Sequence, residues 1–371
     1  MSLIIAEIGT SHQGDINKAI ELVDLAVSAG ANAVKFQWVY ADEILHPNTG
    51  FVQLPTGNVS LYDRFKQFEC DFDFYKTLKD YVKSKNVKFV CSPFGIKSLQ
   101  ELLQLNPDYV KIASPELNHF PMLKALAEYR QNQEKQGIEP IPVILSSGVS
   151  LLKDIEKAIS ILGKKNISLL HCITSYPAPE DEYNLKLVEN LRNIFGIPTG
   201  VSDHSKDPVL VPTLAVAFGA EIIEKHITIS NETDGLDDPI ALNGEQFALM
   251  CHCINQTNVA LKHYGKSVGL EKIINQLQES YDAEKISSVI GSGQKYLAPS
   301  EVNNYGRTNR SLHYLKDFSK GTKITENDIG VLRTEKILTP GISPEFFDDI
   351  CGATLKCDVS SGEGVLLKHF I

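Results

Sequence analysis

The chain of 371 residues has no long uninterrupted apolar run and no excess of basic charge. Its longest apolar stretch, Val209 to Ala220, contains Pro212 and is too short to span a bilayer. Lys and Arg total 36 against 46 Asp and Glu, and the two signs are interspersed along the chain. This distribution argues against binding to nucleic acid or to an anionic membrane. We therefore expect a soluble protein that binds neither.

The sequence also lacks a Cys-x-x-Cys pair, since its seven cysteines are scattered. Such cysteine usage is typical of a reducing compartment. The first residues, Met1-Ser2-Leu3, show neither the basic segment nor the small-residue cleavage site that a secretory signal requires. These features predict a cytoplasmic protein with free thiols.

From residue 1 to about 270, short β-branched apolar runs alternate with amphipathic stretches. This alternation predicts repeated βα units around a parallel sheet. Eight runs qualify as strands: Leu3–Ile8, Ala33–Trp38, Lys88–Ser92, Tyr109–Ala113, Pro142–Ser146, Ser168–Cys172, Thr199–Asp203 and Glu221–Ile227. Eight units predict a (β/α)8 TIM barrel, with the active site at the carboxyl ends of the strands. An open doubly wound sheet is the alternative, but no Gly-rich turn follows the first strand.

Helical periodicity supports this reading between the strands. Apolar residues recur at helical spacing in three places, and each set should face the sheet: Ile16, Ile20, Val23, Val27 and Gly30; Leu123, Leu126 and Ala127; and Ile155, Ile159 and Leu162.

Two segments depart from the repeat. Tyr40 to Glu69 is a long insertion, which predicts a lid or a partner contact. After a polar helix and a Gly-Ser-Gly linker, the last residues have many glycines and little helical periodicity. We predict a barrel domain at 1–285, a linker at 286–305 and a small β-rich domain at 306–371.

Each predicted strand carries polar residues at its carboxyl end, where an active site is expected. They include Glu7; Lys35 and Gln37; Ser92; Lys111 and Ser114; Ser146 and Ser147; Cys172 with Tyr176; Ser202 and His204; and Glu224 and His226. Two inward lysines among hydroxyl groups predict a binding site for phosphate and carboxylate, because ammonium and hydroxyl groups donate hydrogen bonds to anions. The alternative is that each lysine pairs with a core carboxylate.

The histidines at the strand ends differ in what they predict. His204 and His226 end adjacent strands, so their imidazoles could converge on one cation, although structural roles remain the alternative. His171 is interpreted as a hydrogen-bonded structural residue. The Cys251-His252-Cys253 run cannot place three side chains on one helical face, so we interpret it as a feature of a helix surface.

The strand-end strings together resemble the sialic acid synthase family. The matching strings, in family order, are Ala6-Glu7-Ile8-Gly9, Val34-Lys35-Phe36-Gln37, Lys111-Ile112-Ala113-Ser114, Leu145-Ser146-Ser147-Gly148, Leu170-His171-Cys172, Val201-Ser202-Asp203-His204 and Glu224-Lys225-His226. Asn309-Arg310-Ser311-Leu312 and Pro340-Gly341-Ile342 resemble the antifreeze-like (SAF) domain that ends these synthases. The resemblance covers nearly the whole chain.

This resemblance implies a reaction. Members condense phosphoenolpyruvate with the open-chain aldehyde of an N-acyl mannosamine-type sugar, and they release phosphate with the help of a divalent cation, Mn²⁺ or Mg²⁺. The products are nonulosonates for surface glycans. The resemblance also implies a domain-swapped homodimer in which Arg333 of one chain serves the barrel of the other.

Residue by residue, the resemblance implies three groups of roles. Phosphoenolpyruvate would be held by Lys35, Lys111, Ser114, Ser146, Ser202 and Thr174, with Ser92, Ser147 and Glu224 as further substrate contacts. His204 and His226 would hold the metal. Glu7, Gln37, Tyr176 and Asp237 would face the sugar and the attacking water, and Arg333 would donate to the N-acyl group.

Two other activities stay open, and one loop departs from the family pattern. A Schiff-base lyase would use Lys111, Lys35 or Lys225 as nucleophile, and a sugar-binding relative would have lost the chemistry. Many members carry Gly-Pro-Asp-His where this chain has Gly235-Leu236-Asp237-Asp238. We expect Asp238 to lie beside the sugar and to favour a neutral sugar over a 6-phosphorylated one.

Overall fold

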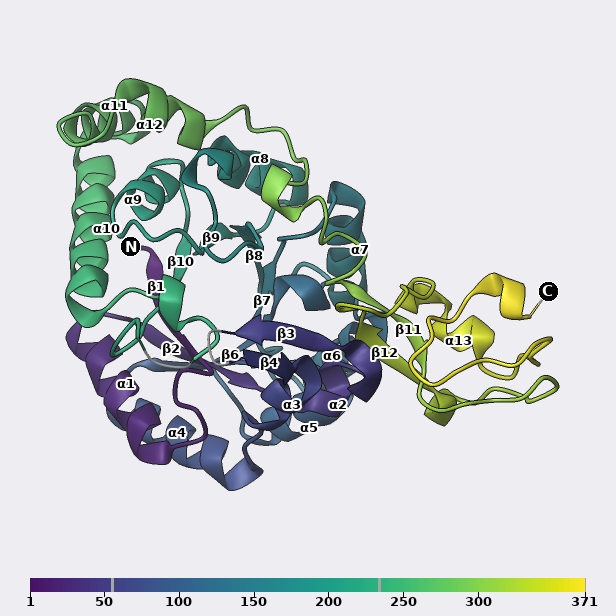
Figure 1. Ribbon diagram of the computed structural model, residues 1–371. Coiled ribbons are helices and arrows are strands. Elements are labelled where there is room, and N and C mark those ends of the chain that lie inside the picture. The colour runs from purple at the N-terminus through teal and green to yellow at the C-terminus, as the bar shows by residue number, and fades with distance from the viewer. Residues whose placement is uncertain (55–56, 233–234, 371) are drawn as a thin grey trace.

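The computed structural model describes residues 1–54, 57–232 and 235–370 and contains a closed barrel with a smaller domain beside it (Figure 1). Eight parallel strands close in the order β1-β10-β9-β8-β7-β6-β5-β2. Their bounds are β1 Leu3–Gly9, β2 Ala33–Trp38, β5 Lys88–Pro93, β6 Tyr109–Ile112, β7 Val143–Ser146, β8 Ile167–Cys172, β9 Thr199–Asp203 and β10 Ile222–His226. The predicted TIM barrel is confirmed, and each strand bound lies within about one residue of its prediction.

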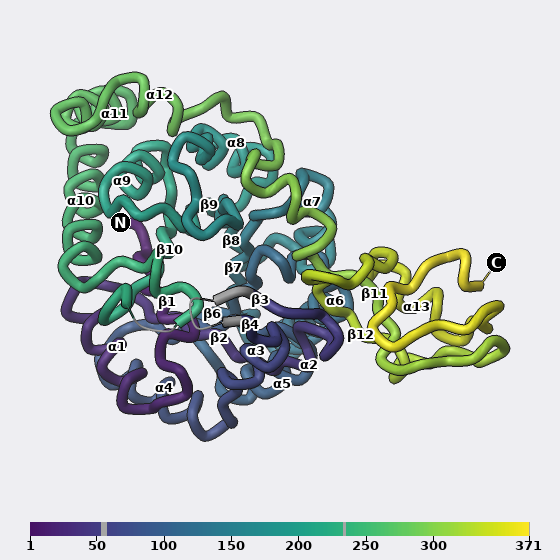
Figure 2. Tube along the Cα trace, in the orientation of Figure 1, coloured from purple at the N-terminus to yellow at the C-terminus, as the bar shows by residue number. Residues whose placement is uncertain are grey.

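Helices surround the barrel, and the chain passes from one βα unit to the next around it (Figure 2). The helices that follow the strands are α1 Ile16–Ser28, α4 Phe72–Ser84, α5 Ile96–Gln104, α6 Phe120–Lys135, α7 Leu152–Leu162, α8 Lys186–Phe195, α9 Leu210–Ala217 and α10 Gly244–Tyr264. The side chain of Asp15 starts α1 by accepting hydrogen bonds from the amides of Asn17 and Lys18.

The predicted helix faces are confirmed for α6 and α7, whereas that of α1 is rotated. Its fully buried residues are Ala19, Leu22, Val23 and Ala26, and Ile16, Ile20 and Val27 are only partly buried. Two alanines in the buried stripe let the helix backbone approach the sheet closely. The larger isoleucines then pack at the edges of the contact.

The barrel interior consists of two layers with opposite chemistry. One layer is a cluster of buried apolar side chains: Ile5, Ala33, Val90, Ile144, Leu170 and Ile222. Side chains two residues further along a strand point to the same side. The next inward layer therefore contains the polar residues of the strand ends, supported from below by an apolar floor.

The insertion after β2 contains helix α2 Ala41–Ile44, strands β3 Phe51–Leu54 and β4 Gly57–Ser60, and helix α3 Leu61–Lys66. Strands β3 and β4 form an antiparallel hairpin. Near its base, the amide of Ile337 donates to the carbonyl of Thr49 at 3.2 Å. The insertion therefore contacts the second domain of its own chain.

The second domain has a core of its own, built around Leu312, Tyr314, Ile324, Leu355 and Val365. Its strands β11 Arg310–Tyr314 and β12 Ile329–Arg333 pair antiparallel, and α13 spans Phe347–Ile350. Between the domains lie α11 Lys266–Leu277 and α12 Ala283–Ile290. The predicted barrel boundary at residue 285 falls inside α12, so the linker begins after this helix.

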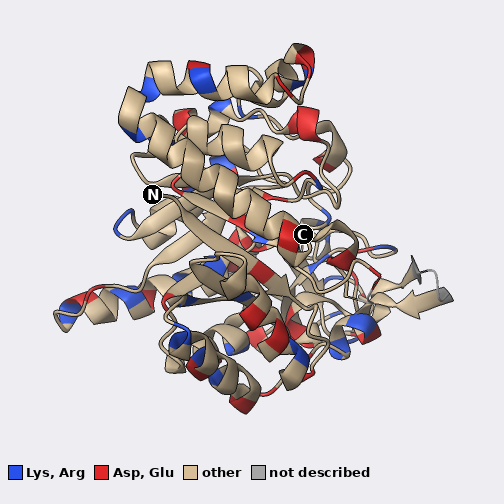
Figure 3. Ribbon diagram, turned by 90° about the vertical axis from the view of Figure 1, so that its left-hand side faces the viewer, with Lys and Arg blue, Asp and Glu red and all other residues tan. Residues whose placement is uncertain are grey.

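Charged residues of both signs are interspersed over the face that Figure 3 presents. None of the described helices is both long enough and apolar enough to cross a membrane.

Gly200 in β9 should be essential for packing in the barrel. A Cβ atom at this position would lie 2.1 Å from the carbonyl oxygen of Ile222 and 2.8 Å from Leu170 Cδ2. Gly200→Ala should therefore destabilise the protein by about 3 kcal/mol or lead to insoluble chains, because the backbone of β10 has little room to move. Denaturant unfolding measures the effect, with exposed Lys164→Ala as control. An unchanged midpoint for Gly200→Ala would contradict this packing.

Candidate active site

The polar layer at the carboxyl ends of the strands lines a pocket, and every barrel strand contributes one residue to its floor. The eight residues are Glu7, Lys35, Ser92, Lys111, Ser146, Cys172, Ser202 and Glu224. Gln37, Phe94, Ser114, Tyr176, His204 and His226 form part of the wall. The structure thus brings most of the predicted site residues together.

Two lysines and two glutamates form a buried ion cluster on the pocket floor. Lys35 Nζ lies 3.2 Å from Glu7 Oε2 and 3.2 Å from Glu224 Oε1, and Lys111 Nζ lies 3.5 Å from Glu224 Oε1. All four side chains are at most 5% exposed. The alternative predicted from sequence, pairing of each lysine with a core carboxylate, is thus present in this structure, and the same lysines line the pocket.

Burial and pairing change the protonation of these groups in different directions. Burial raises the pKa of Glu7 to about 7, although Lys35 opposes the shift. Burial alone would lower the pKa of Lys35, but Glu224 and Glu7 raise it above its usual value. Burial lowers the pKa of Lys111. Lys35 is therefore firmly cationic, whereas Glu7 can exchange a proton near neutral pH.

Two hydroxyl groups in the lining of the pocket, and a third beside Gly148, have no hydrogen-bond partner in the described part of the chain. Within the described part of the chain, the buried Oγ atoms of Ser92 and Ser146 and the Oγ1 atom of Thr174 make no hydrogen bond. An unpaired buried hydroxyl costs free energy unless a ligand or a water binds it. These groups, with the two ammonium groups, fit an anion rich in acceptor oxygens.

Ser114 and Gly148 bring two of the strand-end loops together. The amide of Gly148 donates to Ser114 Oγ at 3.0 Å. A Cβ atom at Gly148 would lie 2.1 Å from Thr174 Oγ1 and 2.9 Å from Ser114 Oγ. Any larger residue at position 148 would therefore displace the predicted phosphate ligands.

Two predicted contacts are wrong in this structure. Ser147 points away from the pocket, and its hydroxyl donates to the carbonyl of Leu170 at 3.0 Å. Asp238 is fully buried, and its carboxylate accepts hydrogen bonds from the Ser11 hydroxyl and from the Gly235 amide. Asp238 thus holds the loop and does not lie free beside a sugar, which removes our argument against a phosphorylated substrate.

His204 and His226 face each other at the pocket, with ring centroids 5.6 Å apart. Tyr176 stacks on His204 at 4.2 Å. His204 Nδ1 lies 2.7 Å from the carbonyl oxygen of Ile173, and His226 Nδ1 lies 3.7 Å from Asp237 Oδ2. Nδ1 of His204 is therefore engaged, which leaves its Nε2 atom for a ligand. The separation of His226 Nδ1 from Asp237 is too long for a hydrogen bond.

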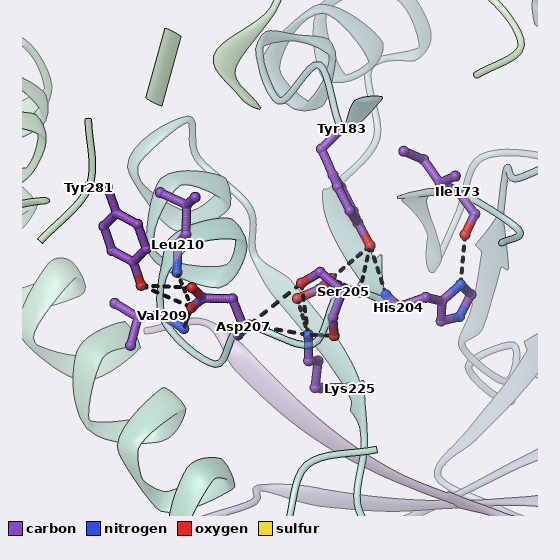
Figure 4. A network of polar contacts seen from close by, with 10 residues as sticks. Ile173, Tyr183, His204, Ser205, Asp207, Val209, Leu210, Lys225 and Tyr281 are labelled. Carbon is purple, nitrogen blue, oxygen red and sulfur yellow. Dashed lines mark hydrogen bonds and ion pairs between the residues drawn. The ribbon is translucent and has the colours of Figure 1, made fainter. Parts of the chain in front are cut away.

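A buried network behind the pocket positions His204 (Figure 4). The Tyr183 hydroxyl donates to Asp203 Oδ1 and accepts from the His204 amide, both at 2.7 Å. Asp203 also pairs with Lys225 at 2.6 Å. Lys225 therefore lies in the network outside the pocket and is not placed as a nucleophile. His171, as predicted, is structural, because its Nε2 bonds the Tyr183 carbonyl at 2.6 Å.

The two facing imidazoles could supply only part of the ligands of a metal ion, so substrate and water would have to supply the rest. Among the described residues, no three His, Cys, Asp or Glu side chains form a group that could hold an ion by themselves. Catalytic sites commonly leave positions to substrate and water. Burial keeps His226 neutral by lowering its pKa, whereas Cys172 raises the pKa of His204 to about 9 against the effect of burial. A cation at His204 would therefore displace a proton.

The second domain reaches the edge of the pocket through two arginines. Glu116, at the end of a 3₁₀ turn over Ser114–Glu116, is fully buried and pairs with Arg310 of β11 and with Arg333 of β12. The Arg333 guanidinium also lies 5.4 Å from the ring centroid of Phe94, which lines the pocket. In this structure, Arg333 thus lies beside the pocket of its own chain.

Some residues of the site escaped the sequence analysis. Phe94 and Pro115 line the pocket, but they are apolar and so were not among the polar strand-end candidates. The pairing of Glu116 with Arg310 became apparent only from the fold. Cys172, which the sequence analysis placed at the carboxyl end of its strand without giving it a role, lies on the pocket floor. Asp237, expected to face the sugar, lies with its Oδ2 atom 3.7 Å from His226 Nδ1, beside the pocket and not in its lining.

A parallel barrel with a charged pocket at the carboxyl ends of its strands defines a TIM-barrel enzyme. Comparison with known proteins specifies the family. Residues 22–266 match the NeuB family and residues 309–371 match the SAF domain. The chain belongs to the NeuB family and is a synthase of the transferase type.

Three relatives illustrate the similarity. The N,N'-diacetyllegionaminic acid synthase of Campylobacter jejuni is 31% identical, with 95% of each chain covered. The crystal structure of the spore coat polysaccharide biosynthesis protein SpsE from Bacillus subtilis has a TM-score of 0.81 and 30% identity, covering 100% of this chain and 95% of that one. The N-acetylneuraminic acid synthetase of Leptospira borgpetersenii, solved with citrate, has a TM-score of 0.60 and 31% identity, covering 82% and 90%.

The raised pKa of Glu7 predicts a pH-dependent cost to stability. Its folded-state pKa of about 7 lies above the value of 4.5 for a free glutamate, so the folded protein gives up stability as pH rises through this interval. Wild type should therefore lose at least about 1 kcal/mol relative to Glu7→Gln between pH 4.5 and 8, since one pKa unit corresponds to about 1.4 kcal/mol. Urea unfolding at both pH values measures the difference. Exposed Glu245→Gln is the matched control, and parallel pH profiles of wild type and Glu7→Gln would contradict the shift.

Proposed function

We propose that this enzyme condenses phosphoenolpyruvate with an N-acyl hexosamine of the N-acetylmannosamine type, giving a sialic acid or related nonulosonate and phosphate. The observation that supports it most is the combination, in one pocket, of paired lysines, unbonded hydroxyls and two facing imidazoles. The product would serve the synthesis of a surface glycan.

The anion half of the pocket would hold phosphoenolpyruvate. Lys35 and Lys111 supply positive charge, and the hydroxyls of Ser92, Ser146 and Thr174 are free to donate to phosphate or carboxylate oxygens. Ser114 and Ser202 complete the set of donors, although Ser202 Oγ now bonds Glu224 Oε1 at 3.0 Å. Fixing both anionic groups presents the enol carbon to an aldehyde without quenching its reactivity.

The imidazole half would hold the sugar and a divalent cation, Mn²⁺ or Mg²⁺. Such a cation at His204 and His226 would polarise the aldehyde oxygen as a Lewis acid. Tyr176 offers an aromatic face over His204, and Gln37 and Asp237 lie at the side of the pocket for hydroxyl contacts. The enol carbon would attack the aldehyde carbon, so that the new C–C bond forms as the C=O π bond opens. The aldehyde oxygen would take up a proton from water and become a hydroxyl, and the neighbouring enol carbon would be left electron-deficient.

Water would add to that carbon before phosphate departs with the bridging oxygen. Glu7 is suited to orient and deprotonate this water, because its pKa of about 7 lets it accept a proton at neutral pH. Gln37 Nε2 donates to Glu7 Oε1 at 2.7 Å and fixes the carboxylate. In this scheme C–O cleavage releases inorganic phosphate.

A Schiff-base lyase is the second candidate, and one observation favours it. Burial lowers the pKa of Lys111, which increases its neutral, nucleophilic form. Borohydride in the presence of keto-sugar acid would then inactivate the enzyme and add mass at Lys111. Such an adduct would contradict the proposed reaction.

The proposed reaction is tested with phosphoenolpyruvate, Mn²⁺ and a panel of N-acyl mannosamines, their 6-phosphates and 2,4-diacetamido-dideoxy hexoses. We expect phosphate release and a matching product mass with at least one sugar, and ¹⁸O from the bridging position of phosphoenolpyruvate should appear in phosphate. His204→Ala and His226→Ala should lose the metal-dependent activity, whereas His252→Ala on exposed α10 should keep it. Full activity of both pocket variants in excess chelator would contradict the assignment of His204 and His226 as metal ligands.

The domain-swapped homodimer is tested through Arg333. If second domains exchange, mixing Arg333→Ala chains with Glu7→Ala chains should restore about a quarter of wild-type activity, because half of the random dimers contain one intact site of two. Neither variant alone should exceed a few per cent of it. No rescue in verified heterodimers would assign Arg333 to its own barrel, where this structure shows it bound to Glu116.

A further inference from the structure

Val149, directly after the pocket loop Ser146–Gly148, has a backbone conformation that β-branched residues avoid. Its φ is +41°, and it is the single β-branched residue with positive φ in the described part of the chain. Such a conformation costs free energy and persists only where the surroundings impose it. The contacts of Val149 therefore show what the loop after β7 requires.

The residues that hold this loop come from the segment between the barrel and the second domain. Glu301 Oε1 accepts hydrogen bonds from the amides of Val149 at 2.7 Å and of Thr174 at 2.6 Å. Asn309 Nδ2 donates to the Val149 carbonyl at 3.0 Å, and Lys295 Nζ donates to the Ser147 carbonyl at 3.2 Å. We name Lys295, Glu301 and Asn309 the linker clamp, because they lie between α12 and β11.

The clamp acts on the loops after β7 and β8, which begin next to Ser146 and Thr174, two of the three unbonded hydroxyls. Glu301 is 1% exposed, and one of its oxygens joins the loop after β7 to the loop after β8. Gly148, the neighbour of Val149, lies against Ser114 Oγ and Thr174 Oγ1. A shift of Val149 would therefore move Gly148 and separate the hydroxyls of Ser114, Ser146 and Thr174.

We propose that Glu301 is a positioning residue for the phosphoenolpyruvate side of the pocket, assisted by Asn309 and Lys295. This inference rests on the proposed function, because it specifies which substrate the clamp serves. Glu301 would touch no substrate atom. It holds Val149 in the left-handed conformation and so keeps the hydroxyl groups at the spacing of one bound anion.

The test separates the two substrates. Glu301→Ala should raise KM for phosphoenolpyruvate about tenfold, which corresponds to the loss of one charge-assisted hydrogen bond, while KM for the sugar changes less than twofold. Glu301→Gln retains one oxygen for both amides and should stay close to wild type. Glu189→Ala is the control, since Glu189 lies in helix α8, outside both pocket loops, and pairs with Lys266 of α11.

A suppressor tests the role of the strain. Val149→Gly removes the steric cost of positive φ, so in the Glu301→Ala background it should recover part of the lost affinity for phosphoenolpyruvate. If Glu301→Ala does not fold, Asn309→Ala removes the bond to the Val149 carbonyl, together with the local bond that Asn309 accepts from the Gly306 amide, and should raise the same KM by a smaller factor.

The outcomes distinguish this inference from the proposed function. If wild type releases phosphate but Glu301→Ala and Asn309→Ala leave KM for phosphoenolpyruvate unchanged, or raise both KM values equally, the positioning role is wrong. If wild type releases no phosphate with any sugar, the proposed function fails. Calorimetric titration with phosphoenolpyruvate then still compares wild type with Glu301→Ala, and equal affinities would overturn the inference.

Discussion

The cost of keeping two lysine ammonium groups inside an apolar barrel governs the architecture of the pocket. A buried ammonium group is costly unless it pairs with negative charge. Lys35 pairs with Glu7 and Glu224, and Lys111 pairs with Glu224, on the floor of the pocket. The four groups sit on four strands, so their pairing depends on the closure of the barrel. Burial of the cluster raises the pKa of Glu7 against the effect of Lys35, which links the protonation of the site to the stability of the fold.

The layered interior explains why so much of the site was predictable. Strands have a period of two, so a buried apolar residue such as Ile144 or Ile222 identifies Ser146 or Glu224 as its inward neighbour. The eight strands and the floor of the pocket follow from this rule. The prediction that Ser147 contacts substrate was wrong because Ser147 follows Ser146 directly, so its side chain points to the opposite face.

The rest of the site depends on contacts that no local pattern contains. The sequence predicted that Asp238 lies beside the sugar. In the structure its carboxylate accepts a hydrogen bond from Ser11, which is more than two hundred residues away in the sequence. Glu116 and Arg310 are ordinary charged residues until the fold buries them together. Glu301 was assigned to a linker. Its hydrogen bond to the amide of Val149, and the positive φ of Val149, cannot be read from the sequence because they depend on the folded structure. The helix α1 was predicted, but the approach of its alanines to the sheet rotated the buried face.

The pairing of β1 with both β2 and β10 has a consequence for how the chain reaches this structure. Glu7 lies opposite His226 in register, so the two candidate catalytic residues become neighbours only when the last strand has joined the first. Contacts of such large sequence separation slow folding, because a long loop must close before they form. During synthesis, the edge of β1 that pairs with β10 stays unpaired until almost the whole barrel has emerged from the ribosome. An incomplete nascent chain can therefore acquire secondary structure and part of its sheet, but it cannot assemble this pocket.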